Sequence, residues 1–202
     1  MRTSYAPEST MRQARNRYFE VNHFGDDGGY GSAWVDFKLG SIPFPFPNTP
    51  ARVKAVRFHD LHHVITAYDT DTLGEFEISA WELAAGCKSM VAAWMLNLMG
   101  LAAGLFAAPK RVFRAFVRGR HSRSLYGLDY EPLLDETVAA VRARMGTDAT
   151  ASSARLGDVL LFLLASGAGL TLGLVMVPLF LAMVPVGLYM QVLRKRQLNA
   201  AP

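Results

Sequence analysis

The sequence predicts an all-α protein with apolar helices at a membrane surface and a C-terminal helical hairpin inserted in the membrane. Half of the chain is apolar, at 51% of 202 residues, and two long runs without charge cover residues 89–108 and 159–193. Between them, charged and apolar residues alternate with helical spacing. We expect a helical metal-binding domain over residues 1–148, followed by a linker and membrane segment over residues 149–202. The single cysteine, Cys87, excludes a disulfide framework and a cysteine-based zinc site.

The most informative stretch is HDLHHVITAYDTDTLGE, which holds three of the five histidines and four acidic residues. In a helix, His59 and His63 leave the same face one turn apart, and Asp60 lies on the flank of that face. The polar segment DTDT should end this helix and begin a second one, whose first turn brings Glu75 back toward the first helix. Two imidazoles and two carboxylates that converge in this way can hold a divalent cation.

Three of these side chains also have a purely structural interpretation. Glu75 fits a capping box with Thr72, in which its carboxylate only satisfies a backbone N–H. His62 and His63 could be surface residues, and His62 is the weaker ligand candidate because it points about 100° away from His63.

Three other segments could contribute polar or covering side chains. Glu82, on the second helix, could bind a metal or orient a ligand, although an exposed glutamate is the more common case. Asp26 and Asp27 lie in a glycine-rich loop and could approach a metal, but a solvated turn is the simpler interpretation. The proline-rich stretch PFPFPNTP should be extended, with Phe44 and Phe46 covering part of a helical core.

Charge is unevenly distributed along the chain. Residues 59–88 contain six acidic residues and one base, whereas residues 109–123 contain six bases and no acidic residue. As a helix, the basic segment separates Lys110, Arg114 and Arg118 from an apolar stripe, which is typical of a helix in a membrane interface with its apolar side toward lipid. Binding to the phosphates of a nucleic acid is an alternative, but no aromatic platform on which bases could stack accompanies the basic segment. We therefore expect a bilayer partner and no nucleic acid.

The clearest apolar feature is the C-terminal run, in which 35 consecutive residues, 159–193, carry no charge before a basic Arg-Lys-Arg sequence. One helix of this length would reach about 52 Å, whereas a hydrocarbon core is about 30 Å thick. Because Pro178 and Pro185 interrupt the run, the sequence favours a hairpin of two helices, about 159–176 and 179–193. A single tilted span with a helical extension is the alternative.

The earlier uncharged run, residues 89–108, is also long enough to cross a membrane. A buried helix of an all-α domain would have the same composition. Basic residues on both sides of residues 159–193 are compatible with two cytoplasmic ends, and the N-terminus lacks the apolar core of a secretory signal. The expected location is therefore the cytoplasmic face of a bacterial inner membrane.

The histidine-rich stretch resembles the signature of the coenzyme Q biosynthesis protein 4 family, which is His-Asp-x-x-His, eleven residues and then Glu. Here His59, Asp60 and His63 are followed by residues 64–74 and then by Glu75, so both identity and spacing match. The similarity covers about residues 55–146, under half of the chain. The glycine-rich loop, the proline-rich stretch and the C-terminal apolar run are not part of the family pattern.

This resemblance implies an all-helical, membrane-associated and often dimeric protein of ubiquinone biosynthesis. His59, Asp60, His63 and Glu75 would be ligands of a divalent metal ion, and zinc, iron and manganese all suit such ligands. The implied reaction is oxidative decarboxylation of a polyprenylated aromatic ring, with hydroxylation at the same carbon. Residues 89–108 would face the polyprenyl tail, and other quinone-biosynthesis proteins would be partners.

Three other functions share part of this pattern. The His-x-x-His-His pattern also occurs in membrane desaturases and hydroxylases, but their di-iron sites need more histidines than the five present here. A zincin-type peptidase needs a glutamate as general base where Asp60 stands. A non-catalytic lipid-binding scaffold that organises quinone-biosynthesis enzymes is the main alternative, because no separate nucleophile or acid–base pair stands out.

Overall fold

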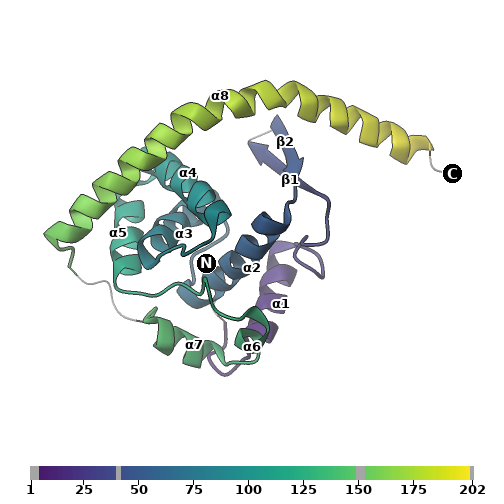
Figure 1. Ribbon diagram of the computed structural model, residues 1–202. Helices are drawn as coiled ribbons and strands as arrows, with labels where there is room; N and C mark the ends of the chain where they lie inside the picture. Colours follow the sequence, from purple (N-terminus) through teal and green to yellow (C-terminus); the bar gives the residue numbers. More distant parts are fainter. Residues whose placement is uncertain (1–4, 40–41, 149–152, 201–202) are drawn as a thin grey trace.

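A computed structural model of the chain describes residues 5–39, 42–148 and 153–200, and it is predominantly helical (Figure 1). The prediction of an all-α protein is confirmed. The elements are α1 (Met11–Asn22), β1 (Trp34–Leu39), β2 (Ile42–Pro47), α2 (Pro50–Thr66), α3 (Thr72–Ala85), α4 (Val91–Ala107), α5 (Pro109–Arg120), α6 (Tyr130–Leu134), α7 (Val138–Met145) and α8 (Leu156–Ala200).

The α3 helix lies at the centre of the domain, between α4 and α5, and its Trp81 is fully buried (Figure 1). Both neighbours approach it through glycines. Gly100 of α4 lies against the side chain of Ser79, and Gly119 of α5 lies against the carbonyl of Trp81. No side chain fits at either contact, so α4 and α5 approach α3 closely at these two glycines. They form a close-packed support for the residues at the start of α3.

Two arginines from distant helices cover the carboxyl end of α2. Arg118 of α5 donates to the carbonyl of Thr66 at 2.9 Å, and Arg142 of α7 donates to the carbonyls of Val64 and Ile65 at 2.8 and 3.2 Å. These are the carbonyls that the end of a helix leaves without partners. The position of α2 is thus fixed by charged donors as well as by its buried face.

The proline-rich stretch forms the second strand of a hairpin, in which β1 and β2 pair antiparallel with Trp34 opposite Pro47. Its prediction as an extended segment is confirmed. Prolines at every second position suit a strand that pairs along only one edge. The side chains of Phe44 and Phe46 lie outside the described part of the structure, so their predicted role in covering the core stays a prediction.

The basic segment after residue 108 forms α5, but its apolar side does not face lipid. Val112, Phe116 and Val117 are at most 4% exposed, because α5 packs on α3 and α8. The prediction of an interfacial helix with its apolar side in the membrane is therefore wrong for this segment. An amphipathic pattern shows that one face is covered, and here the cover is protein.

The sequence of residues 125–146 predicts a turn followed by one amphipathic helix, with an apolar stripe and a stop at Gly146. Residues 130–145 form two short helices instead. Thr137 caps the second helix by accepting from the N–H of Ala140. The predicted apolar stripe is nevertheless buried, and Gly146 ends the segment in the left-handed conformation, as expected. The buried stripe consists of Leu133, Leu134, Val138 and Val141.

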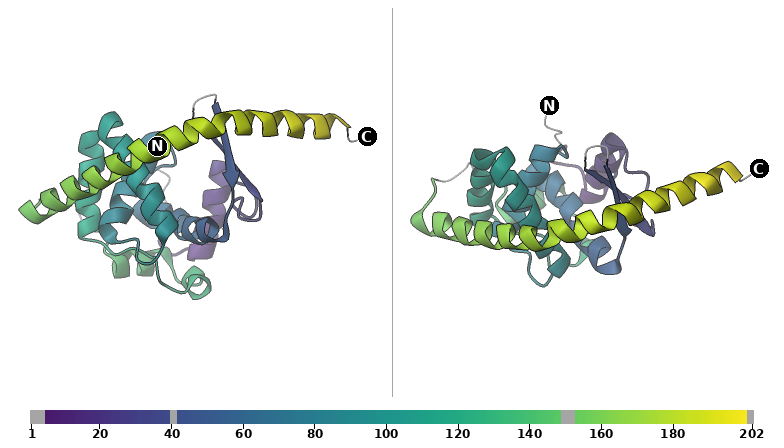
Figure 2. Two further views of the ribbon diagram at one scale, coloured as in Figure 1. Left: turned by 45° about the horizontal axis from the view of Figure 1, so that its top comes forward. Right: turned by 90° about the horizontal axis from the view of Figure 1, so that it is seen from above.

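The C-terminal run forms one continuous 45-residue helix, α8, with Pro178 and Pro185 inside it. The predicted hairpin is therefore wrong, and the alternative of one long helix is closer to the structure. The segment Leu156–Leu179 is long and apolar enough to cross a membrane. Three views show that α8 curves along the outside of the domain, past α5, α4 and the hairpin (Figures 1 and 2).

Candidate metal centre

Three of the four predicted ligands converge where α2 faces the start of α3. The Nε2 atoms of His59 and His63 lie 3.2 Å apart. The two carboxylate oxygens of Glu75 lie 3.3 Å from them, one oxygen from each ring nitrogen. One ligand atom from each residue lies within 4.8 Å of the other two. The predicted convergence of the i, i+4 histidines and the glutamate is confirmed as geometry.

The turn between the helices explains how Glu75 reaches the histidines. Asp71 caps α3 by accepting from the N–H of Gly74 at 2.6 Å. Gly74 lies directly against the carbonyl of Asp69, where no side chain would fit. Because Asp71 supplies the cap, the predicted capping box with Thr72 does not form, and the Glu75 carboxylate faces α2.

Hydrogen bonds to the far side of each imidazole determine which nitrogen carries a proton. The Nδ1 atom of His63 lies 3.0 Å from the carbonyl of Tyr68, which can only accept, so Nδ1 is protonated. The Nδ1 atom of His59 lies 2.9 Å from a carboxylate oxygen of Glu82 and is protonated for the same reason. Both Nε2 atoms are then left with a lone pair directed toward Glu75.

The arrangement of these three side chains favours a cation between them. Two nitrogen lone pairs and a carboxylate repel one another at these distances unless positive charge lies between them. A proton or a metal ion could supply that charge. Two imidazoles and one carboxylate are a ligand set of catalytic zinc sites that keep an open position, and carboxylate or carbonyl partners on the far nitrogens are typical of metal-bound histidines.

Glu82 is the centre of a buried polar network behind the three ligands. Its side chain is fully buried, and one oxygen accepts from Nδ1 of His59 and of His62, at 2.9 and 2.7 Å. The other oxygen accepts from the side-chain amide of Asn97 at 2.5 Å and from the hydroxyl of Tyr126 at 2.7 Å. The interpretation of Glu82 as an exposed residue is wrong. Its second interpretation, as a residue that orients a ligand, is the one that the geometry supports.

His62 belongs to the same network and not to the surface. It is fully buried, donates from Nδ1 to Glu82, and accepts at Nε2 from the N–H of Leu125 at 2.8 Å. Burial lowers the pKa of His62, although the charge of Glu82 opposes this effect. The interpretation of His62 and His63 as surface residues is wrong, because both are buried. The expectation that His62 is a weaker ligand than His63 agrees with both nitrogens of His62 being engaged.

Asp60 is buried beside the three ligands but is not one of the converging group. Its carboxylate accepts from the hydroxyl of Tyr30 at 2.5 Å. Burial raises the pKa of Asp60 to about 6, with His59 acting in the opposite direction. Tyr30 comes from the glycine-rich loop, where Asp27 accepts from two backbone N–H groups of its own turn. The loop thus contributes a tyrosine to the site, and Asp27 has the role of a turn residue.

The charges around the ligands favour a cation at their meeting point. Burial opposes charge on His59, but Glu82 and Glu75 outweigh it and raise the pKa of His59. Burial likewise opposes ionisation of Glu75, yet His63 and His59 lower its pKa to about 2. The ring of Tyr18 stacks on His63 with 5.5 Å between ring centroids. This side of the site is closed, and the more exposed side is that of Glu75, whose side chain is 42% exposed.

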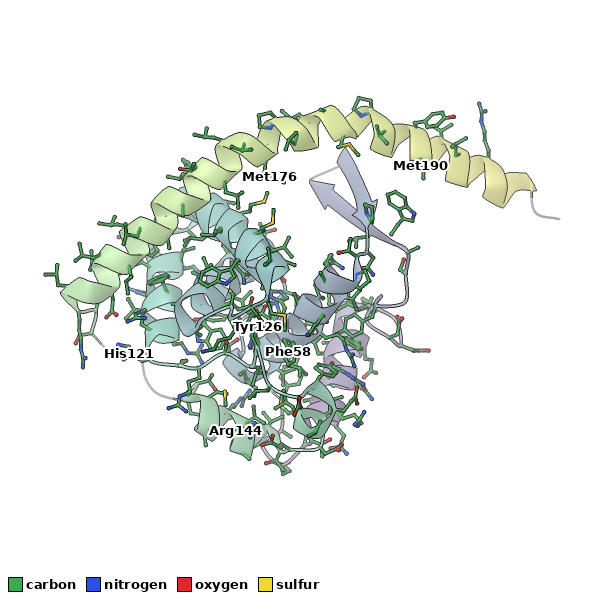
Figure 3. All side chains as sticks on the ribbon, in the orientation of Figure 1. Phe58, His121, Tyr126, Arg144, Met176 and Met190 are labelled. Atoms are coloured by element: carbon green, nitrogen blue, oxygen red, sulfur yellow. The ribbon has the colours of Figure 1, made fainter. Side chains whose placement is uncertain are left out.

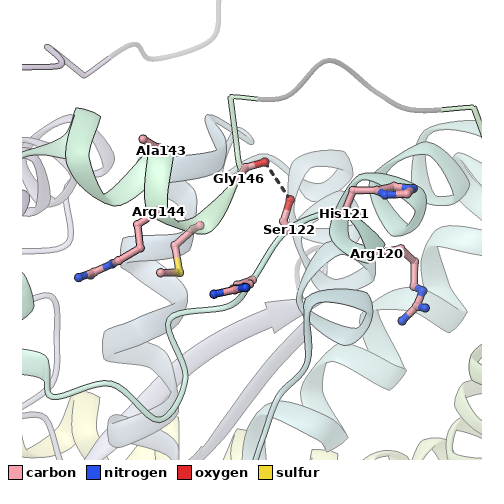
Figure 4. A pocket seen from close by; sticks show the side chains of 8 residues that line it. Arg120, His121, Ser122, Ala143, Arg144 and Gly146 are labelled. Atoms are coloured by element: carbon pink, nitrogen blue, oxygen red, sulfur yellow. Dashed lines mark hydrogen bonds between the residues drawn. The ribbon is translucent and has the colours of Figure 1, made fainter.

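Two surface hollows lie outside the group of three converging ligands. One, of about 470 Å³, is lined by Tyr30, Asn48 and Arg57 among others. The second, of about 380 Å³, lies between the end of α5 and α7, where Arg120 and Arg144 point away from each other (Figure 4). Neither hollow is lined by the three converging ligands.

The centre therefore combines three converging ligands, a buried carboxylate that orients one of them, and an adjacent Asp60–Tyr30 pair. Tyr30 is the member that sequence patterns missed, whereas Glu82 is one of the residues that the sequence offers for orienting a ligand. Comparisons of the chain with family models, with curated proteins and with solved structures found no match.

Proposed function

We propose that this chain is a membrane-associated, metal-dependent protein of quinone or prenyl-lipid biosynthesis. The observation that carries the proposal is that the Nε2 atoms of His59 and His63 converge with the carboxylate of Glu75. Hydrogen bonds to Nδ1 of each imidazole fix the direction of the Nε2 lone pair. The resemblance of the His59–Glu75 signature to the coenzyme Q biosynthesis protein 4 family supports the pathway. The proposed reaction is oxidative decarboxylation, with hydroxylation, of a polyprenylated aromatic ring: the ring carbon loses its carboxylate as CO₂ and gains a hydroxyl group from water, while dioxygen takes up the two electrons and becomes hydrogen peroxide.

Some of these side chains would bind the metal ion, and others would orient its ligands. Bound there, a zinc, iron or manganese ion would supply a Lewis acid for a substrate carboxylate or phenolate. His59, His63 and Glu75 would hold it, with Asp60 as a fourth residue close by. Glu82 fixes His59 in the tautomer that presents Nε2. The more exposed side, at Glu75, leaves room for a substrate group.

The α4 helix is the proposed place for an apolar tail. It has no charged residue, and Trp94, Met95 and Phe106 are exposed on it at 40, 40 and 81%. Its Gly100 packs on α3 within one turn of Glu75. A tail along α4 would therefore reach the same end of α3 that carries a ligand. The proposed setting is the cytoplasmic face of a bacterial inner membrane, with other quinone-biosynthesis proteins or a second copy as partners.

Metal analysis tests the centre directly. We expect elemental analysis of the purified full-length protein to find about one divalent ion per chain, as in other three-ligand sites. His63→Ala and Glu75→Ala should lose it while circular dichroism shows a retained fold. His23→Gln is the matched control, because His23 is exposed at the end of α1 and outside the group. Full metal content in His63→Ala would contradict the assignment.

A second measurement separates an enzyme from a scaffold. Mass spectrometry should find a polyprenyl lipid that co-purifies with the wild-type protein. Glu75→Gln, introduced into cells that depend on this chain, should abolish the quinone product and accumulate the ring that still carries its carboxylate. An unchanged quinone profile with a folded, metal-free Glu75→Gln protein would rule out the enzyme and favour the lipid-binding scaffold.

A further inference from the structure

None of the described residues of the chain covers the outer surface of α8. Domain-facing residues recur along the helix at helical spacing from Asp158 to Met190, whereas the residues between them are exposed. The exposed set is almost entirely apolar, and Leu164 and Leu174 are 70 and 78% exposed. Figure 3 shows carbon side chains along the outer side of α8 over most of its length. A patch of this extent marks an interaction surface.

The inner side of α8 is attached to the domain at several successive points. Asp158, in the first turn, lies 3.3 Å from Arg120 at the end of α5. Phe162 packs on Phe113 and Phe116 with 5.0 and 5.3 Å between ring centroids. Further along, α8 contacts α4 and then β2. The helix is therefore tangential to the domain from its start to beyond its middle (Figure 2).

Such attachment conflicts with an upright crossing of a membrane. The midpoint of the apolar segment Leu156–Leu179 falls between Phe162, which contacts α5, and Gly169, which contacts α4. An upright segment would carry α5 to the middle of the bilayer, together with its exposed Lys110 and Arg114. Charged side chains at that depth are strongly unfavourable.

We propose that α8 lies in the plane of the membrane interface, with the domain beneath it and lipid on its outer side. An interfacial helix normally has its own polar face, and here the protein domain takes the place of that face. The exposed Trp94 and Phe106 of α4, which packs against α8, belong to the same lipid-facing surface.

Charge favours a bilayer over a second copy as the occupant. The uncharged run is preceded by Arg155 and followed by Arg194, Lys195 and Arg196, so basic residues lie at both ends of the helix. These positions suit the anionic headgroups that would surround an in-plane helix. The exposed apolar residues also spread over the outer side and both flanks of α8, whereas a helix partner would need only one stripe.

Depth measurements in vesicles of equal parts phosphatidylcholine and phosphatidylglycerol test this proposal. Nitroxides are attached to Leu164→Cys, Leu174→Cys or Leu181→Cys in the full-length Cys87→Ser protein. An in-plane helix keeps all three at shallow depths, about 5–10 Å below the headgroups. An upright helix separates the first and last by about 25 Å in depth, at 1.5 Å per residue, and that result would overturn the proposal.

Sidedness gives an independent result. When purified protein is added to sealed vesicles, an impermeant maleimide should label Asn199→Cys as fully as Glu131→Cys, which is on the exposed side of α6. Protection of Asn199→Cys until detergent is added would show a crossing and contradict the in-plane arrangement.

Vesicle flotation with a matched pair of variants tests the surface itself. We expect Leu174→Glu to weaken binding at least tenfold and Ala140→Glu, on the exposed side of α7 opposite α8, to leave it unchanged (Figure 1). Equal binding of both variants would overturn the proposal. So would a stable lipid-free dimer in which the α8 nitroxides are in contact with each other.

Discussion

The region around Glu82 and the outer side of α8 differ in where their partners come from. Around Glu82, both oxygens are occupied by donors from the same chain, contributed by α2, α4 and the loop after α5. On α8, large apolar side chains such as Leu174 are exposed, and no described residue covers them. The first region is complete within one chain, whereas the second needs something outside it.

This difference decides which statements follow from the chain alone. A buried carboxylate with four donors fixes the tautomer of His59, and so the direction of a ligand, without reference to any other molecule. An exposed apolar face shows only that its partner is apolar. Its identity follows from how α8 is attached and from the charges at its two ends.

Removing the carboxylate of Glu82 should have the largest effect. Glu82→Leu would remove the carboxylate acceptor from four buried donors: the Nδ1–H groups of His59 and His62, the Asn97 amide and the Tyr126 hydroxyl. We expect the free energy of unfolding to fall by about 3–5 kcal/mol, measured by urea unfolding in detergent. Glu82→Gln keeps an acceptor for both imidazoles and should lose less than half of that. Equal stability of Glu82→Leu and wild type would show that the network does not exist.

The second largest effect should be the difference in alkylation between Cys87 and a cysteine introduced on α8. Burial raises the pKa of the Cys87 thiol from 9.0 to about 12, with Glu82 adding to the effect. At pH 8 its thiolate population, and hence alkylation by iodoacetamide, should be about a thousandfold below that of Leu174→Cys in detergent. Because the folded state favours the protonated thiol, this contribution to stability is present below pH 9 and is lost as the pH rises toward 12.

The control for this comparison is denaturation. In urea, Cys87 and Leu174→Cys should react at the same rate, because both thiols are then free. Rapid alkylation of Cys87 in the folded protein would show that the region around Glu82 opens readily, in contrast to its complete burial here.

The convergence of His59, His63 and Glu75 could be predicted from sequence because its geometry is local. The four-residue spacing of His59 and His63 places both on one helix face, and the polar segment before Thr72 ends one helix and starts the next. The sequence offers an orienting role for Glu82, but its burial and its donors could not be predicted in the same way, since Asn97 and Tyr126 become its donors only after α4 and the loop after α5 have packed. Tyr30 reaches Asp60 from 30 positions away in the sequence.

The shape of α8 shows a different limit. Pro178 and Pro185 suggest a break between two helices, yet the helix continues through both. Seven residues correspond to about two turns, so the two prolines lie on the same face of the helix. Both are exposed, and Figure 1 shows the helix convex on its outer side. Their bends add to one curve around the domain, and a curve of this kind depends on what lies inside it.

Arg118 should contribute less than Glu82 because it is only partly buried. Its guanidinium donates to the carbonyls of Thr66 and Thr147 at 2.9 and 2.7 Å. Arg118→Met would leave both carbonyls without this donor, and we expect a loss of about 1.5–3 kcal/mol in the free energy of unfolding. Arg114→Met, at an exposed position of the same helix, should change it by less than about 0.5 kcal/mol. Equal effects of the two variants would show that the carboxyl end of α2 does not depend on Arg118.

The smallest expected effect tests the contact that joins the two regions. A Cβ atom at Gly169 would lie 2.5 Å from the carbonyl oxygen of Leu98 on α4, whereas one at Gly167 would meet nothing within 4 Å. Gly169→Ala should therefore destabilise the protein by about 1 kcal/mol or slightly more through overpacking. Gly167→Ala should stabilise it by up to about 1 kcal/mol through helix propensity.

The opposite signs of these two effects are the informative result, because the substitutions are chemically identical and two residues apart. Hydrogen exchange of α4 would show the same contact, with faster exchange near Leu98 in Gly169→Ala and unchanged exchange in Gly167→Ala. If both substitutions stabilise the protein equally, α8 is not held on α4 at this point. The helix would then be free to leave the domain and cross a bilayer upright, and the in-plane arrangement would lose its structural basis.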